Sequence, residues 1–122
     1  MKVFIAEDQA WFLEQLTELV ASVPGAEFVG SADTAQGAIA SIRANPPDVV
    51  LVDLMLHEGT GFEVLRCLRA DGITSLLWVV TSFPTPGIKK VCMIGGADDF
   101  FDKLLDLDKL RMKLESIALK LN

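Results

Sequence analysis

The sequence predicts a single α/β domain in which helices cover both faces of a parallel β-sheet. Short apolar runs rich in β-branched residues alternate, along the whole chain, with segments whose apolar residues recur every three or four positions. One of these runs, residues 49–52, contains no polar residue, as expected for a central strand that is buried on both faces. The 122 residues, of which 51% are hydrophobic, suffice for one core, so we expect one domain spanning residues 1–122.

Five apolar runs predict five strands. They cover residues 3–6, 28–32, 49–52, 76–80 and, with the weakest signal, 100–101. Because a helical segment separates each run from the next, the strands should lie parallel and be joined by right-handed crossovers.

Five segments with helical periodicity follow the strands one by one, each with a single apolar face. The residues predicted to face the core are, in chain order, Phe12, Leu16, Leu19, Val20 and Val23; Ala35, Ala38, Ile39 and Ile42; Phe62, Leu65 and Leu68; Ile88, Val91 and Cys92; and Leu107, Leu110, Leu114, Ile117, Ala118 and Leu121. Pro84 and Pro86 should delay the fourth helix, which is expected to be short and to end at the glycine pair 95–96. Asp106 or Asp108 is the expected N-cap of the fifth helix.

The charge balance and the cysteine content limit the functions to consider. With 17 acidic and 11 basic side chains the net charge is −6, which disfavours direct binding to the phosphate backbone of nucleic acids. The two cysteines, Cys67 and Cys92, are not spaced like a metal site or a redox pair, so a reduced, cytoplasmic protein is expected. No segment is typical of a signal peptide or a membrane span, and we expect neither membrane insertion nor an output domain in this chain.

Polar and charged residues follow four of the five predicted strands, at the point where each strand ends. They are Glu7 and Asp8 after the first strand, Asp53 after the third, Thr81 and Ser82 after the fourth, and Asp102 and Lys103 after the fifth. Because parallel strands bring their carboxyl ends to one edge of the sheet, these groups should form one site. So many carboxylates close together are unfavourable unless a ligand offsets their repulsion, and a hard cation is the natural ligand.

The residues at this edge suit metal-assisted phosphoryl transfer. Magnesium commonly binds one or two carboxylates together with phosphate oxygens, and Asp8 and Asp53 would supply the carboxylates. One carboxylate could attack phosphorus while Lys103 and the hydroxyl of Thr81, or of Ser82 in its place, stabilise the transferring oxygens. The sequence has no glycine-rich nucleotide-binding loop, so the phosphoryl donor should be a separate molecule.

With these residues in place, the chain resembles the receiver domains of bacterial two-component response regulators over essentially its whole length. The segments that carry the resemblance are VFIAED, VVLVDLML followed by GTGFEVL, WVVTSF and GADDFFDK. The resemblance implies a flavodoxin-like, doubly wound sheet of five parallel strands in the order 2-1-3-4-5, with five helices on its two faces.

The resemblance also implies a role for each matching residue. Asp53 matches the phosphoacceptor, and Glu7 and Asp8 match the acidic pair that organises a magnesium or manganese ion, with Glu7 acting through water. The remaining matches are the backbone carbonyl of Met55 as a metal ligand, Thr81 as the switch hydroxyl, Lys103 as the site lysine and Phe100 as the aromatic switch residue.

The function implied by the resemblance is that of a phosphorylation-dependent signalling switch. A sensor histidine kinase or a histidine phosphotransfer domain would donate the phosphoryl group. The surface of the fourth helix, fifth strand and fifth helix would then change, to bind a downstream protein effector or to pass the phosphoryl group onward. Such a domain dephosphorylates itself slowly and is not a turnover enzyme. Two alternatives remain, namely that the domain forms a homodimer, and that it is a degenerate receiver that binds a partner without phosphorylation.

Two substitutions depart from the family's usual pattern. Leu104 stands where a proline usually follows the site lysine, and a trans peptide is expected because a non-proline cis peptide costs about 2.5 to 4 kcal/mol. Leu56 replaces the usual proline three residues after the phosphoacceptor, so we expect the following loop to be built differently from the family's usual one. Apolar Met55 and Phe83 beside the site lead us to expect slow hydrolysis of an aspartyl phosphate. His57, the only histidine, should be an exposed bystander.

Overall fold

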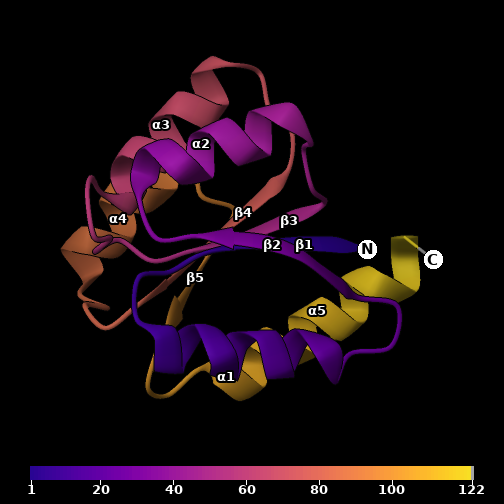
Figure 1. The fold of residues 1–122 in the computed structure, drawn as a ribbon. Helices are drawn as coiled ribbons and strands as arrows, with labels where there is room; N and C mark the ends of the chain where they lie inside the picture. The colour runs from indigo at the N-terminus through magenta and orange to yellow at the C-terminus, as the bar shows by residue number, and fades with distance from the viewer. Residues whose placement is uncertain (122) are drawn as a thin grey trace.

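The structure, a computed structural model, describes residues 1–121 and has a central β-sheet with helices on both faces (Figure 1). Five parallel strands lie in the order β2-β1-β3-β4-β5. Their bounds are Lys2–Ala6 for β1, Glu27–Ala32 for β2, Val49–Val52 for β3, Leu76–Thr81 for β4 and Asp99–Asp102 for β5. The predicted fold class and strand order are confirmed, and no strand departs from its predicted run by more than one residue at either end.

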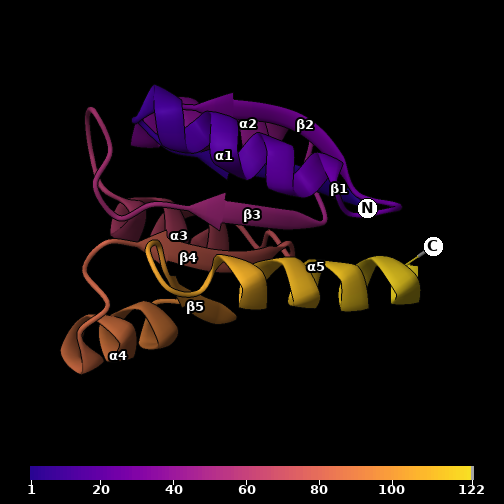
Figure 2. The same ribbon diagram turned by 90° about the horizontal axis from the view of Figure 1, so that it is seen from below.

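The five helices divide between the two faces of the sheet. They are α1 (Ala10–Ala21), α2 (Ala35–Ala44), α3 (Gly61–Ala70), α4 (Pro86–Ile94) and α5 (Leu107–Leu121). Helices α1 and α5 cover one face, and α2, α3 and α4 lie on the other (Figure 1, Figure 2). Because all strands are parallel, this winding places the carboxyl end of every strand at the same edge of the sheet.

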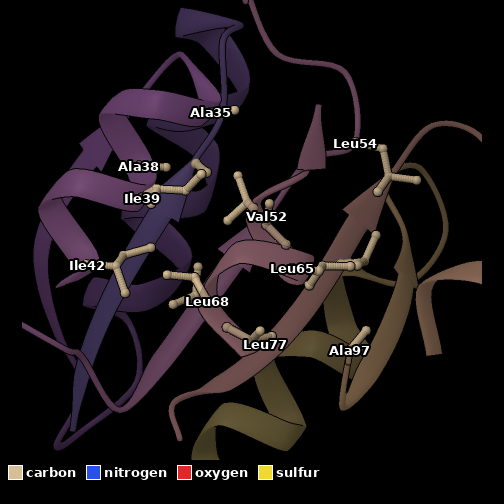
Figure 3. Close-up of a cluster of buried hydrophobic side chains, with 14 of the residues drawn as sticks. Ala35, Ala38, Ile39, Ile42, Val52, Leu54, Leu65, Leu68, Leu77 and Ala97 are labelled. Carbon is tan, nitrogen blue, oxygen red and sulfur yellow. The ribbon is translucent and has the colours of Figure 1, made fainter. Parts of the chain in front are cut away.

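Side chains of the inner strands alternate between two hydrophobic cores. In β1, Val3 and Ile5 point to the α1–α5 side, whereas Phe4 and Ala6 point to the α2–α3 side. All four residues of β3 are buried, two on each side, which explains the absence of polar alternation in its sequence. Figure 3 shows the core on the α2–α3 side, where side chains of both helices pack over β3 and β4.

Three residues predicted to face the core are exposed instead. Phe62 is 36% exposed, and Val91 and Leu121 are each 55% exposed. Phe62 and Leu121 lie in end turns of α3 and α5, and within α3 the residue Val64 takes the core position. Val91 is exposed because α4 packs against the edge strand β5, where only Cys92 of this helix is buried. A helical period identifies an apolar face, but it does not show how far the sheet extends beneath that face.

The prediction for α4 is confirmed in its main points, and one detail differs. Residues 82–85 are not helical, and α4 has nine residues and ends directly before the glycine pair 95–96. Pro86 itself is the first helical residue, a position where the N–H that proline lacks would have no partner in the helix, and the Thr85 hydroxyl caps the helix. Asp106 occupies the predicted N-cap position of α5, since it directly precedes the helix and its carbonyl accepts a hydrogen bond from the Leu110 N–H. Its carboxylate does not cap the helix but accepts a hydrogen bond from the backbone N–H of Asp102, at the end of β5 (2.8 Å). Asp108 lies within the first turn of α5 and is not its cap.

Arg69 of α3 ties the beginnings of β4 and β5 together. Its guanidinium donates to three backbone carbonyl oxygens, including that of Gly96, and pairs with Asp98 Oδ2 at 2.7 Å. The same Asp98 oxygen accepts a hydrogen bond from the backbone N–H of Leu77 in β4 at 2.8 Å. This network fixes β5 against β4, and β5 in turn carries Lys103 to the carboxyl edge of the sheet.

Candidate functional site

Three carboxylates meet at the carboxyl edge of the sheet. Glu7 and Asp8 follow β1, and Asp53 follows the neighbouring strand β3. One oxygen from each carboxylate lies within 4.8 Å of the others. Glu7 and Asp53 are buried, whereas Asp8 is open to solvent. The structure therefore brings together three of the four acidic residues that sequence analysis places at this edge. The fourth, Asp102, lies outside this cluster, and its Oδ1 accepts a hydrogen bond from the backbone N–H of Leu104 at 2.8 Å.

Lys103 follows β5 and reaches into the same site. Its Nζ lies 2.9 Å from Asp53 Oδ2, 2.9 Å from Glu7 Oε1 and 4.4 Å from the centre of the Phe12 ring. Burial opposes the charge on Lys103, but the hydrogen bonds to the two carboxylates outweigh that effect and raise the pKa of the ammonium. A buried ammonium held in this way is a fixed part of the site and not a solvated surface lysine. The peptide bond to Leu104 is trans, as predicted.

Glu7 organises the start of α1. Its Oε2 accepts hydrogen bonds from the backbone N–H groups of Asp8 and Gln9, both at 3.0 Å. Burial raises the pKa of Glu7 to about 7, against the opposing hydrogen bonds from Lys103 and from the Gln9 N–H, and the nearby charge of Asp53 adds to the increase. Because one oxygen faces N–H groups and the other faces Lys103, this arrangement favours a role through water over direct metal ligation.

The two predicted switch residues lie in the neighbouring strands β4 and β5. Thr81, the last residue of β4, is fully buried, and its Oγ1 accepts a hydrogen bond from the backbone N–H of Phe83 at 3.1 Å. The alternative hydroxyl, that of Ser82, is exposed. Phe100 is half-buried against the α2–α3 core, whereas Phe101 is buried on the opposite face of the sheet. The switch roles of Thr81 and Phe100 stay predictions.

A hollow of about 260 Å³ opens at these groups. Its lining residues are Asp8, Gln9, Asp53, Met55, Ser82, Phe83 and Lys103. Met55 and Phe83 are each about half exposed and form an apolar rim beside the carboxylates. Gln9 is not among the site residues predicted from the sequence. The one sequence feature that could have indicated it is its position directly after the acidic pair.

The loop after β3 holds Asp53 close to the start of α3. A Cβ at Gly61 would come within 2.4 Å of the Asp53 carbonyl oxygen, so this position requires glycine. Gly59 has a φ of 79°, in the left-handed region, and reverses the chain ahead of α3. Leu56, at the usual proline position, is buried, whereas His57 is exposed, as predicted.

The ligands at this edge suit a hard divalent cation. The cluster consists of carboxylate oxygens, which magnesium and manganese prefer over sulfur or imidazole ligands. The cluster contains three carboxylates, two of which pair with one buried ammonium, and a bound cation would reduce the excess negative charge. The exposed position of Asp8 also leaves its carboxylate accessible from solvent. The residues present therefore fit a magnesium-type site.

Together, the fold and the site define a class of protein: a doubly wound α/β domain whose acidic pocket lies at the carboxyl edge of its sheet, with a lysine beside it. The family model of the response regulator receiver domain matches residues 3–115, and the chain belongs to this family. Receiver domains act in phosphorylation-dependent signalling within two-component systems. Within the described residues, no helix has the length and apolar character needed to cross a membrane.

Curated relatives carry this type of domain in proteins of several kinds. The two-component response regulator ORR41 from Oryza sativa is 29% identical over 126 residues, covering 98% of this chain and 95% of that protein. A protein-glutamate methylesterase/protein-glutamine glutaminase from Anaeromyxobacter dehalogenans is 33% identical over 103 residues, which are 84% of this chain and 30% of the relative. A cyclic di-GMP phosphodiesterase from Thermotoga maritima is 40% identical over 67 residues, which are 55% of this chain and 18% of the relative. The chain thus spans less than a third of the last two proteins.

Solved structures of response regulators share the fold. A DNA-binding response regulator of the LuxR family from Staphylococcus aureus superposes with a TM-score of 0.87 at 24% identity, covering 96% of this chain and 98% of that chain. A chain of the CheX–CheY–BeF3–Mg2+ complex from Borrelia burgdorferi gives a TM-score of 0.87 at 22% identity, with coverage of 96% and 88%. At these identities the likeness establishes the fold.

Proposed function

We propose that this chain is a signalling switch that accepts a phosphoryl group on Asp53 from the phosphohistidine of a sensor histidine kinase or a histidine phosphotransfer domain. The observation that carries the proposal is the buried Asp53 carboxylate, which lies 2.9 Å from Lys103 Nζ within an acidic cluster. Membership of the receiver family supports the same assignment.

Asp8 and Asp53, with the backbone carbonyl of Met55, would hold a magnesium or manganese ion, and Glu7 would act on it through water. When bound, such an ion supplies positive charge that offsets the repulsion between a carboxylate and the phosphoryl oxygens. The all-oxygen ligand set and the accessibility of Asp8 support this assignment.

In the proposed transfer, one oxygen of Asp53 attacks the phosphorus atom of the phosphohistidine. A P–O bond to Asp53 forms while the P–N bond to histidine breaks, and the imidazole nitrogen leaves with the electron pair of that bond and takes a proton from solvent. Lys103 balances negative charge on the phosphoryl oxygens. Hydrolysis later returns Asp53, when water attacks phosphorus and inorganic phosphate leaves. Because the phosphoryl group resides on the chain itself, the domain acts as a switch and not as a turnover enzyme.

Phosphorylation would bias two arrangements of the domain. The Thr81 hydroxyl would turn from the Phe83 N–H to a phosphoryl oxygen, and Phe100 would repack behind it. The half-buried position of Phe100, beside the core under α2 and α3, supports such a movement. The surface formed by α4, β5 and α5 would then bind a downstream protein effector, or the domain would pass its phosphoryl group onward.

Intact mass spectrometry tests this proposal. The wild type and the variant Asp53→Ala are incubated with acetyl phosphate or phosphoramidate, with and without magnesium. We expect the wild type to gain the mass of one phosphoryl group only when magnesium is present, and the variant to gain none. If the wild type binds magnesium but forms no adduct, the domain is a phosphorylation-independent interaction module instead.

A further inference from the structure

Gln9 contacts the ammonium of Lys103 from the start of α1. Lys103 Nζ donates a hydrogen bond to Gln9 Oε1 at 3.3 Å, in addition to its 2.9 Å contacts with Asp53 and Glu7. An ammonium carries three hydrogens and no lone pair. Nζ donates hydrogen bonds to Asp53 Oδ2 and Gln9 Oε1, whereas Glu7 Oε1 lies beside it as an ion-pair partner. Two of the three oxygens around Nζ belong to carboxylates, and the third belongs to the neutral carboxamide of Gln9.

Gln9 occupies the N-cap position of α1, but its side chain does not cap the helix. Its backbone is extended, with φ −89° and ψ 112°, and its carboxamide makes no capping hydrogen bond. The N-caps of α2, α3 and α4 are threonines whose hydroxyls do accept hydrogen bonds from helix N–H groups, the usual arrangement at this position. The Gln9 carboxamide is therefore available to Lys103 and has no competing role in the helix.

The three residues whose side-chain oxygens surround the Lys103 ammonium differ in their exposure to solvent. Glu7 and Asp53 are buried, whereas Gln9 is exposed and lines the hollow together with Asp53 and Lys103. Gln9 therefore meets the ammonium on the solvent-exposed side of the site, where a phosphodonor must enter. A carboxamide accepts a hydrogen bond without adding negative charge, whereas another carboxylate at this place would repel an anionic donor.

We propose that Gln9 is a positioning residue that orients the Lys103 ammonium for phosphoryl transfer to Asp53. The inference rests on the proposed function. With one hydrogen held by Gln9 and the ammonium paired with Glu7 at 2.9 Å, another hydrogen is directed at Asp53 and, during transfer, at the phosphoryl oxygens. Without the Gln9 acceptor, the ammonium keeps its charged partners but can turn toward water at the open side, so fewer molecules hold it in the productive direction.

The variant Gln9→Met tests this role because methionine has a similar length but no carboxamide. Gln15→Met is the matched control, since Gln15 is an exposed glutamine on the same helix that lines a different hollow, between α1 and α5. We expect Gln9→Met to lower the rate constant for phosphorylation by acetyl phosphate by about three- to tenfold, the effect of losing one hydrogen bond to a charged group near the surface. Gln15→Met should match the wild type, and calorimetry should give the same magnesium affinity for all three proteins.

A second measurement follows Lys103 itself without any phosphodonor. In protein labelled with 15N-lysine, the Nζ resonance of Lys103 is assigned by its loss in Lys103→Arg, and the exchange of its hydrogens with water is measured. We expect faster exchange in Gln9→Met than in the wild type and Gln15→Met. Unchanged exchange, or faster exchange with an unchanged phosphorylation rate, would overturn the positioning role and leave the proposed function intact. A wild type that is never phosphorylated would overturn both.

Discussion

Lys103 shows how a single side chain determines the character of this site. The ammonium is buried between Asp53 and Glu7, and its charge is retained because a carboxylate oxygen of each lies 2.9 Å from Nζ. The same ammonium offsets part of the repulsion between Asp53 and the nearby carboxylates of Glu7 and Asp8. The site is therefore prepared for an incoming phosphoryl group, because a positive group lies beside the attacking carboxylate before the donor arrives.

Met55 and Phe83 lead to a prediction about the lifetime of the phosphorylated state. Both side chains line the hollow beside Asp53, where they would restrict the approach of the attacking water. Replacing both by polar residues, Met55→Asn with Phe83→Ser, should speed the loss of the phosphoryl group on the order of tenfold, which is about 1.4 kcal/mol of activation free energy. The decay is followed by intact mass. Leu119→Ser, an exposed apolar position on α5, should decay like the wild type, and an unchanged rate in the double variant would contradict the hypothesis.

The two cysteines should differ in reactivity. Burial raises the pKa of the Cys92 thiol to about 11, so at neutral pH it carries even less of the nucleophilic thiolate than an ordinary cysteine does. Cys67 is only partly buried. We expect a thiol reagent at neutral pH to label Cys67 well before Cys92 in the folded protein, and to label both at similar rates in denaturant. Equal labelling of the native thiols, measured with Cys67→Ser and Cys92→Ser, would show that α4 opens readily.

At the scale of the elements, the close approach of α3 to the end of β3 positions Asp53. Gly61→Ala would place a Cβ within 2.4 Å of a backbone oxygen, which cannot move as a flexible side chain does. We expect a loss of about 2 to 4 kcal/mol in the free energy of unfolding, measured with urea. Gly87→Ala in α4 is the control, because a Cβ there meets nothing within 4 Å, and it should be neutral or slightly stabilising. Equal stability of the two variants would rule out the close contact.

The network around Arg69 connects α3 to the starts of β4 and β5. Arg69→Ala would leave three backbone carbonyls and the Asp98 carboxylate without their donor, so we expect the free energy of unfolding to fall by about 2 kcal/mol. The matched control is Arg43→Ala, because Arg43 forms an exposed ion pair with Asp71 that should contribute little. Urea unfolding of both variants measures the difference, and a larger loss in Arg43→Ala would contradict this account.

At the scale of the whole molecule, a bound metal should stabilise the fold. Magnesium that binds only the native state adds about 2.7 kcal/mol when its concentration is 100 times its Kd. Asp8→Asn removes one of the three carboxylates, so it should stabilise the metal-free protein by reducing repulsion and should shrink the gain from magnesium. Thermal unfolding with and without magnesium tests both effects. A magnesium-dependent rise in Tm that persists in Asp8→Asn would place the metal elsewhere.

The architecture was predictable from sequence because its signals are local and repeated. The uninterrupted apolar run of β3 and the charged residues after the strands indicate both the parallel sheet and the edge that carries the site. What sequence does not reveal depends on contacts between distant segments. The exposure of Val91 follows from the edge position of α4, and the contact between Gln9 and Lys103 joins residues from opposite ends of the chain. Neither the exposure of Val91 nor the contact between Gln9 and Lys103 is indicated by a local sequence pattern.

The central claim is that Asp53 is the residue that carries the phosphoryl group. The most direct measurement is to phosphorylate the protein with acetyl phosphate and magnesium, reduce the acyl phosphate with borohydride, and locate the modified residue by peptide mass spectrometry. Reduction converts an aspartyl phosphate to homoserine, so we predict homoserine at position 53 and unmodified aspartate at position 8. Homoserine at another position, or none in a protein that binds magnesium at this site, would contradict the account.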